Sequence, residues 1–329
     1  MRAMIVEEFG GPEVFKPATI PRPEIRPGHL LLRVEATCVN PLDCKLRSLP
    51  LPFSPPLPAV LHTDVAGVVE EVGADVTGFR PGDEVYASAG SVGGYSGALA
   101  EFMLADAALA AHKPRSLGMG EAAALPLVAI TAWESLVDRG RVGPGDRVLI
   151  HGAAGGVGHV AIQIAKTLGA EVFATGSSEE KLAIGRELGA DGVINYREES
   201  VADYLGRVTE GRGFDVVLDT VGGENLERSF EAARANGTVV TIAGGGGHDL
   251  TWMQAKSLTL HVESMLLPLI RNAGRAAQGE ILRNVTQLVE EGRLKPLIDP
   301  NVFTIDQVAQ AHRHLESGKA VGKVVLTRQ

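Results

Sequence analysis

Cysteine is scarce in this 329-residue chain: only Cys38 and Cys44 occur, and both lie in the stretch CVNPLDC. With so few cysteines and no signal-peptide core at the start of the sequence, we expect a cytosolic protein with free thiols. Long apolar runs are lacking too, since no stretch approaches the roughly 18 uninterrupted apolar residues of a membrane-spanning helix. Positive charge is in deficit, and the formal net charge of −9 argues against nucleic acid as a main partner.

Glycine, by contrast, is abundant, with 40 residues, so tight turns and close backbone approaches should be frequent. The chain is long for a single hydrophobic core, which predicts two domains. Residues 1–125 contain short β-branched and apolar runs separated by turns, which predicts an antiparallel, partly closed β-domain. From about Thr131 such runs alternate with amphipathic segments, which predicts βαβ units around a parallel sheet. The last part of the chain is expected to return to the first domain.

The segment VLIHGAAGGVGHVAIQIA places a glycine-rich turn between a predicted strand and a predicted helix. Gly155 and Gly156 would let the backbone approach a pyrophosphate, whose charge the helix N-terminus favours. Gly158 would allow the helix to pack closely against the strand. Ala153 departs from the usual G-x-G-x-x-G pattern, but the strand–turn–helix context and the βα units that follow predict dinucleotide binding.

The residues after the second strand of this domain bear on which dinucleotide binds. An NAD site usually has an acidic residue there to hold the ribose 2′-hydroxyl, but this chain has Thr175, Gly176, Ser177 and Ser178. The small hydroxyl residues leave room for a 2′-phosphate, and Lys181 can supply its countercharge. NADP(H) is therefore favoured over NAD(H), and the alternative is that Lys181 is an ordinary solvated helix residue.

Several motifs follow one another along the chain: AGVVEEVG, PGDEVYA, AAGGVGHVAIQIAK, GADGVINYRE, DTVGG and GKVVL. In this order the chain resembles the medium-chain dehydrogenase/reductase superfamily and, within it, the zinc-free quinone oxidoreductase (zeta-crystallin-like) branch. The resemblance implies a GroES-like β-rich catalytic domain from residues 1–125 and 265–329, and a Rossmann doubly wound NADP(H)-binding domain from residues 126–264. It also implies NADPH as cofactor and a homodimer paired through residues 257–264, for which an ordinary buried strand is the alternative.

The resemblance further assigns cofactor-binding residues by motif. The pyrophosphate falls to Gly155, Gly156, Val157 and Gly158, the adenosine phosphate to Gly176, Ser177, Lys181 and Tyr196, and the nicotinamide half to Thr131, Val221, Ala243 and Gly244. Val221 and Ala243–Gly244 follow strand ends, where ligands bind in such sheets. For Tyr196 the alternative role is to cap the third strand.

Zinc-dependent members of the superfamily ligate a catalytic metal with a Cys, a His and a Glu, and this chain departs at each place. Asn40 stands at the place of the cysteine, Thr63 at that of the histidine, and Asp64 at that of the glutamate. His62 is one residue away, and such a shift points a side chain elsewhere. The sequence therefore predicts no metal site, and the two cysteines are expected to be small buried thiols.

Without a metal to polarise a carbonyl, the expected reaction is hydride transfer to an acceptor that is already activated, a quinone or an α,β-unsaturated carbonyl compound. The candidate catalytic residues are Asn40, as hydrogen-bond donor to the developing oxyanion, together with Thr63 and Asp43. Asp43 is expected either to fix Asn40 or to contact the nicotinamide ribose. Tyr95 is expected either to face the small-molecule substrate or to stiffen its glycine-rich loop. Two alternatives stay open: a zinc-free ketone or aldehyde reductase, and an NADPH-binding scaffold or sensor with little turnover.

Overall fold

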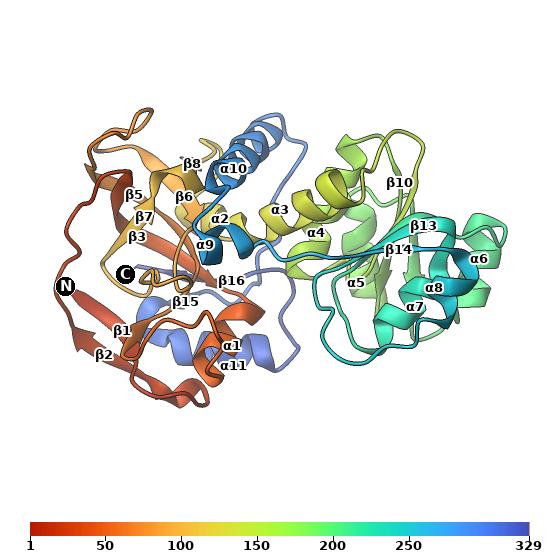
Figure 1. The fold of residues 1–329 in the computed structure, drawn as a ribbon, viewed down its shortest axis with the longest axis horizontal. Helices are drawn as coiled ribbons and strands as arrows, with labels where there is room; N and C mark the ends of the chain where they lie inside the picture. The colour runs from red at the N-terminus through yellow and green to blue at the C-terminus, as the bar shows by residue number, and fades with distance from the viewer. Residues whose placement is uncertain (329) are drawn as a thin grey trace. The chain divides into compact units, whose positions relative to one another are not determined.

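The computed structural model describes residues 1–328, and the chain divides into two compact units (Figure 1). Unit 1 contains Met1–Ile130 together with the segment that begins at Leu266, and unit 2 is Thr131–Met265. The chain therefore leaves unit 1 once and returns to it. One unit is built mainly on antiparallel strands and the other on a parallel sheet, which confirms the predicted α/β fold class.

Unit 1 is organised around one long strand, β3, whose apolar side chains are almost all buried. It pairs antiparallel with β5, β7 and β16, the last of which comes from the C-terminal end of the chain. The two sheets of the unit have the strand orders β2-β1-β4 and β15-β16-β3-β5-β6-β8. The strands are β1 (Arg2–Val6), β2 (Phe15–Thr19), β3 (His29–Val39), β4 (Ala59–Val60), β5 (Asp64–Val72), β6 (Glu84–Ser88), β7 (Phe102–Asp106), β8 (Ala110–His112), β15 (Phe303–Thr304) and β16 (Val324–Thr327).

Helices cover parts of these sheets, and Figure 1 shows α10 lying beside β8, with which it is in contact. The core of the unit is aliphatic: Leu30 and Leu32 of β3 pack in one cluster with Val65 and Val69 of β5. Burying each such side chain contributes about 1.5–3 kcal/mol. The helices are α1 (Pro41–Ser48), α2 (Met119–Ala123), α9 (Leu267–Arg271), α10 (Arg275–Glu290) and α11 (Val308–Glu316), and α3 (Pro126–Trp133) runs across the division between the units.

Unit 2 is a parallel sheet of six strands in the order β11-β10-β9-β12-β13-β14. Its strands are short apolar runs buried on both faces, as expected when helices cover a parallel sheet. Strand order reverses at β9, so the carboxyl ends of β9, β10 and β12 border the crevice where such sheets bind ligands. The elements are β9 (Arg147–Ile150), α4 (Gly156–Thr167), β10 (Glu171–Gly176), α5 (Glu179–Glu187), β11 (Gly192–Asn195), α6 (Val201–Thr209), β12 (Phe214–Asp219), α7 (Glu224–Ala232), β13 (Ala233–Thr241), α8 (Thr251–Lys256) and β14 (Thr259–Val262).

The stretch CVNPLDC contains the end of a strand and the start of a helix, whereas the sequence predicts strands and turns in this part of the chain. Cys38 and Val39 end β3, Asn40 is the N-cap of α1, and Pro41 occupies its first turn, where a missing N–H does no harm. Both cysteines are buried free thiols, as expected. No helix in residues 1–328 is long and apolar enough to cross a membrane.

Candidate functional site

Asp43 joins the start of α1 to the segment that leads into β5. Its carboxylate accepts a hydrogen bond from the backbone N–H of Asn40 at 2.8 Å and another from the backbone N–H of Thr63 at 3.2 Å. Burial raises the pKa of Asp43 to about 7, and these two N–H donors oppose the rise. Asn40, Asp43 and Thr63, which the sequence predicts to be catalytic, therefore lie together, and the Asp43 carboxylate binds the backbone of the other two.

The side-chain amide of Asn40 is fully buried and engaged at both ends. Its nitrogen donates to Oδ2 of Asp64 at 2.9 Å and lies 3.5 Å from the hydroxyl oxygen of Thr63. Its oxygen accepts a hydrogen bond from the ammonium group of Lys323. The Asn40 nitrogen that was predicted to meet a substrate oxygen is thus already donating to a carboxylate of the same unit.

Asp64 is the acceptor around which this cluster is built. Besides Asn40, it accepts from the backbone N–H of Leu127 at 2.9 Å and from the thiol of Cys38 at 3.3 Å. Burial raises the pKa of the Cys38 thiol well above its usual value, so this thiol acts as a donor and not as a thiolate ligand. No group of three His, Cys, Asp or Glu side chains in the described chain is arranged to hold a metal ion.

His62 does not face this cluster with a free ring nitrogen; it belongs to a directional chain of hydrogen bonds. Arg47, which can only donate, lies 3.1 Å from Nδ1 of His312, so the proton of His312 is on Nε2. That Nε2 lies 2.9 Å from Nε2 of His62, which places the proton of His62 on Nδ1, 3.1 Å from the hydroxyl of Thr37. The Thr37 hydroxyl donates to the backbone carbonyl of Asp64 at 2.6 Å.

Both imidazoles of this hydrogen-bonded pair are neutral. Burial lowers the pKa of His62 to about 3, and burial also lowers the pKa of His312 well below its usual value. The backbone of His62 has φ +77°, in the left-handed region that a residue of its kind rarely adopts. The hydrogen bonds of the imidazole pair fix the side chain of His62 directly before Thr63 in the chain.

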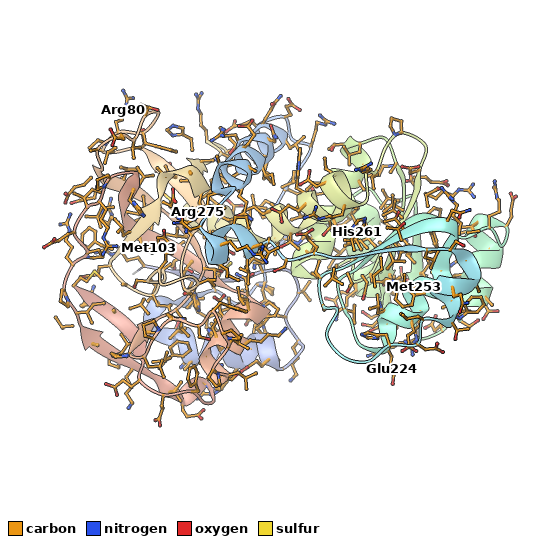
Figure 2. The ribbon with its side chains drawn as sticks, in the orientation of Figure 1. Arg80, Met103, Glu224, Met253, His261 and Arg275 are labelled. Atoms are coloured by element: carbon orange, nitrogen blue, oxygen red, sulfur yellow. The ribbon has the colours of Figure 1, made fainter. Side chains whose placement is uncertain are left out.

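Tyr95 lies outside the cluster, and its hydroxyl is bound within unit 1. Arg275, which is labelled in Figure 2, donates to the Tyr95 hydroxyl at 2.6 Å and to Asp106 at 2.7 Å. The Arg275 guanidinium also lies 4.9 Å from the centre of the Tyr95 ring, in a cation–π contact. Of the two roles expected for Tyr95, these contacts favour the stiffening of its glycine-rich loop.

In unit 2, the glycine-rich turn has the geometry of an anion-binding helix N-terminus. Gly155 is the N-cap of the 12-residue helix α4 and offers no side chain to its free N–H groups. Gly152 has φ +80°, and a Cβ on Gly158 would lie 2.0 Å from the carbonyl oxygen of Gly152. The backbone N–H groups at the start of α4, at Gly156 and Val157, are thus left for a ligand, and Gly158 cannot be replaced without moving the turn.

A cavity of about 520 Å³ opens at the carboxyl ends of β9, β10 and β11. Two of its lining residues, His151 and Tyr204, have a buried polar atom (Nε2 and the hydroxyl) that meets no hydrogen-bond partner in the described chain. A buried polar atom without a partner is unfavourable by about 1–3 kcal/mol, so a ligand that pairs with it is stabilised. The size, position and polarity of the cavity fit an adenosine group.

The residues assigned to the adenosine phosphate lie near this cavity in the chain. Gly176 ends β10, Ser177 follows it, and Tyr196 lines the cavity with 47% of its surface exposed. Lys181 lies in the first turn of α5, whose N-cap is Ser178. Among residues 1–328 the Lys181 ammonium has no ion-pair or hydrogen-bond partner, which leaves it available to an anion.

Two loops on the other side of β9 carry the residues assigned to the nicotinamide half, and one buried carboxylate ties them together. Asp219 accepts from the backbone N–H of Val221 at 3.0 Å and from the hydroxyl of Thr241 at 3.1 Å. The Thr241 hydroxyl in turn accepts from the backbone N–H of Ala243 at 3.2 Å. Val221 is held 59% exposed, Gly244 follows Ala243, and Thr131 is buried in α3.

Sequence reasoning missed four residues that organise these sites: Asp219, Thr241, His151 and Lys323. Asp219 could have been found, because an acidic residue stands at the end of a buried strand just before a glycine turn, in DTVGG. Lys323 carries a similar signal, as the charged residue next to the apolar strand in GKVVL. The partners of both depend on contacts that local spacing does not reveal.

Comparison with known proteins gives consistent matches along the chain. Residues 26–115 match the alcohol dehydrogenase GroES-like domain, and residues 188–326 match a family described as zinc-binding dehydrogenase. The zinc of that description has no counterpart in the cluster around Asn40, where an amide, a hydroxyl and an ammonium group meet.

Three relatives illustrate the similarity. An NADPH-dependent alkenal/one oxidoreductase of Arabidopsis thaliana is 34% identical over 99% of this chain and 79% of its own length. A quinone oxidoreductase of Pongo abelii is 32% identical over 99% of this chain and 97% of its own. The crystal structure of an alcohol dehydrogenase superfamily protein from Novosphingobium aromaticivorans covers all of both chains with a TM-score of 0.95 at 42% identity.

Proposed function

Because the chain belongs to the quinone oxidoreductase branch of the medium-chain dehydrogenase/reductase superfamily, we propose that it transfers a hydride to quinones or α,β-unsaturated carbonyl compounds. The observation that carries the proposal is the buried Asn40–Thr63 pair, in which the Asn40 amide nitrogen lies 3.5 Å from a neutral hydroxyl that can act as a donor. Such a donor suits an acceptor that is already electrophilic. The reduced nicotinamide, when bound, supplies the hydride from its C4 position.

The residues of unit 2 support NADPH as the preferred cofactor. The N-terminus of α4 would hold the pyrophosphate through Gly156 and Val157, and the cavity lined by His151 would hold the adenosine. The unpaired ammonium of Lys181, with the Ser177 hydroxyl, would bind a 2′-phosphate. The loops tied by Asp219 would border the nicotinamide.

In unit 1, we propose that Thr63 is the residue that donates a hydrogen bond to the oxygen of the hydride acceptor. The Asn40 amide directs one N–H at Asp64 and the other towards the Thr63 hydroxyl oxygen. Thr63 is fully buried, and no residue in the described chain accepts the proton of its hydroxyl; we propose that an oxyanion seated against it accepts this proton. Asn40 then acts behind Thr63, and Asp43 fixes the backbone of both.

The first test is turnover with a panel of quinones, enones and simple aldehydes, with NADPH or NADH, and with or without a chelator. We expect NADPH-dependent reduction of quinones or enones that a chelator does not affect. Reduction of simple aldehydes alone would favour the ketone and aldehyde reductase alternative. Tight NADPH binding with no turnover would favour a scaffold or sensor, and inhibition by the chelator would contradict the metal-free site.

Two variants test the assigned residues. T63V keeps the shape of Thr63 and removes its hydroxyl, and should lower kcat by roughly 10²-fold, while T63S keeps most activity. K181A should raise the KM for NADPH by roughly 10–100-fold and leave that for NADH unchanged, because a charge-assisted bond is worth about 1.5–3 kcal/mol. K319A, at an exposed lysine of unit 1, is the control. Equal effects of K181A on both cofactors would refute the assignment.

A homodimer paired through β14 also belongs to the proposal. Among the strands of residues 1–328, β14 is at the edge of the parallel sheet and pairs only with β13; Val262 in it is 61% exposed. A free strand edge with apolar side chains can pair with a second copy. Light scattering should give a dimer for the wild type and a monomer for V262K; a monomeric wild type would show that β14 is an ordinary edge strand.

A further inference from the structure

Lys323 is a buried lysine that the proposed function does not yet use. It stands directly before β16, and 3% of its surface is exposed. The antiparallel register pairs Val324 with Val39, so the residues next to them, Lys323 and Asn40, lie at the same end of the two strands. The Lys323 ammonium donates a hydrogen bond to the amide oxygen of Asn40.

The surroundings of this ammonium are dominated by negative charge. Asp43 and Asp64 are both fully buried, and burial raises the pKa of each, while the positive charge of Lys323 lowers the pKa of each. Arg47, another buried cation of unit 1, is paired with Glu316 at 2.6 Å and lies on the far side of the imidazole pair. Lys323 is therefore the cation that compensates the two carboxylates, and buried charges are tolerated only when they are compensated.

The same ammonium decides which way the Asn40 amide faces. Because an ammonium can only donate, it selects the amide oxygen and forces the Asn40 nitrogen towards Asp64 and Thr63. A flipped amide would place N–H groups against the ammonium. The orientation of Asn40 in turn leaves the Thr63 proton for an acceptor.

We propose that Lys323 is a positioning residue of the reductase site, which compensates Asp43 and Asp64 and orients the Asn40 amide so that the Thr63 hydroxyl donates to the acceptor. The inference rests on the proposed function of Thr63 as that donor. Lys323 acts through Asn40 and does not itself touch the substrate. The residue belongs to unit 1 alone, so cofactor binding by unit 2 should not depend on it.

The test is kinetic, with the full-length enzyme and a quinone or enone that the wild type reduces. K323M keeps the length of the side chain and removes its charge. It should lower kcat by about tenfold or more, with the Kd for NADPH within about twofold of wild type. The control is K113M, at a second buried lysine of unit 1, which binds the backbone carbonyls of Pro114 and Leu117. K113M should keep kcat within about twofold.

A double variant separates positioning from general loss of structure. If Lys323 acts through Thr63, K323M added to T63V should lower kcat no further, because the donor is already absent. Independent, multiplying effects would overturn the inference, as would a folded K323M with kcat within about twofold of wild type. If K323M does not fold, the double variant K323M/D64N replaces it, because this variant removes one carboxylate together with the cation. K323M/D64N should fold and still show the lowered kcat. A wild-type kcat in K323M/D64N would also overturn the inference. A wild type without quinone or enone turnover would instead refute the proposed function.

Discussion

The paired imidazoles of His62 and His312 make a quantitative prediction about acid stability. The perturbation is H62N, since asparagine tolerates the left-handed backbone at φ +77° and does not titrate near neutral pH. The folded pKa of His62 is lowered to about 3, and that of an unfolded histidine is about 6.5. His62 therefore stabilises the fold above pH 6.5, and this stability is lost as the pH falls towards 3.

The magnitude follows from the separation of the two pKa values. At pH 7.5 His62 is neutral in both states, but at pH 4.5 the unfolded chain has bound a proton that the folded chain excludes. The two-unit difference between pH 6.5 and 4.5 corresponds to about 3 kcal/mol, at about 1.4 kcal/mol per unit. At pH 7.5 H62N should be less stable than wild type by about 1–2 kcal/mol, because Thr37 and His312 lose a partner. At pH 4.5 this deficit should be cancelled or reversed.

Other titrating groups do not obscure the comparison. The raised pKa of Asp43 has the opposite sign, since its contribution is full below pH 3.8 and is lost as the pH rises through 7. Asp43 is present in both proteins and its pKa has no contribution from His62, so its effect largely cancels in the difference.

The assay is amide hydrogen exchange in peptides of β3 and β5, because both tryptophans, Trp133 and Trp252, lie in unit 2 and fluorescence would not report on unit 1. The control is H112N, at an exposed histidine, which should follow the wild type at both pH values. If wild type and H62N lose protection in parallel between pH 7.5 and 4.5, the assignment of His62 as a neutral buried imidazole is wrong.

Two further predictions concern the glycine turn and the loop of Tyr95. G158A should weaken NADPH binding by about tenfold or more, because its Cβ would lie 2.0 Å from the Gly152 carbonyl oxygen. The control is G206A, where a Cβ meets nothing within 4 Å, and it should leave NADPH binding unchanged. Equal NADPH titration curves for the two variants would contradict this prediction. Y95F removes the hydroxyl that accepts a hydrogen bond from Arg275, and it should destabilise unit 1 by about 1.5–3 kcal/mol without changing kcat. A kcat lowered about tenfold would instead mean that Tyr95 contacts the substrate.

The cofactor side of the protein could be predicted in some detail because its signals are local. The spacing of Gly155, Gly156 and Gly158 between a strand and a helix predicts a turn with exposed N–H groups, and this prediction does not depend on contacts with distant parts of the chain. The small residues after β10 lie within a few positions of Lys181. Alternating strands and helices fix the parallel sheet and therefore the edge at which these residues meet.

The unit 1 site could be predicted only as a set of residues, because its interactions join distant parts of the chain. Asn40 and Asp43 are close in sequence, and the hydrogen bond from the Asn40 backbone N–H to the Asp43 carboxylate is one half of a capping box, which the stretch NPLD could have indicated. The direction of the Asn40 amide depends on Lys323, which lies 283 positions away. Likewise, the sequence does not decide between the two roles of Tyr95, because its partner Arg275 lies 180 positions later.

The return of the chain to unit 1 has a consequence for biosynthesis. Strand β16, which pairs with β3, is made after every residue of unit 2. A nascent chain can thus assemble the whole parallel sheet of unit 2 before β16 has been made and can pair with β3. The reason is that domains tend to fold in order as they leave the ribosome. Lys323 joins the cluster around Asn40 only after unit 2 has been made, so a product truncated before Lys323 would retain all of unit 2 and lack one member of that cluster.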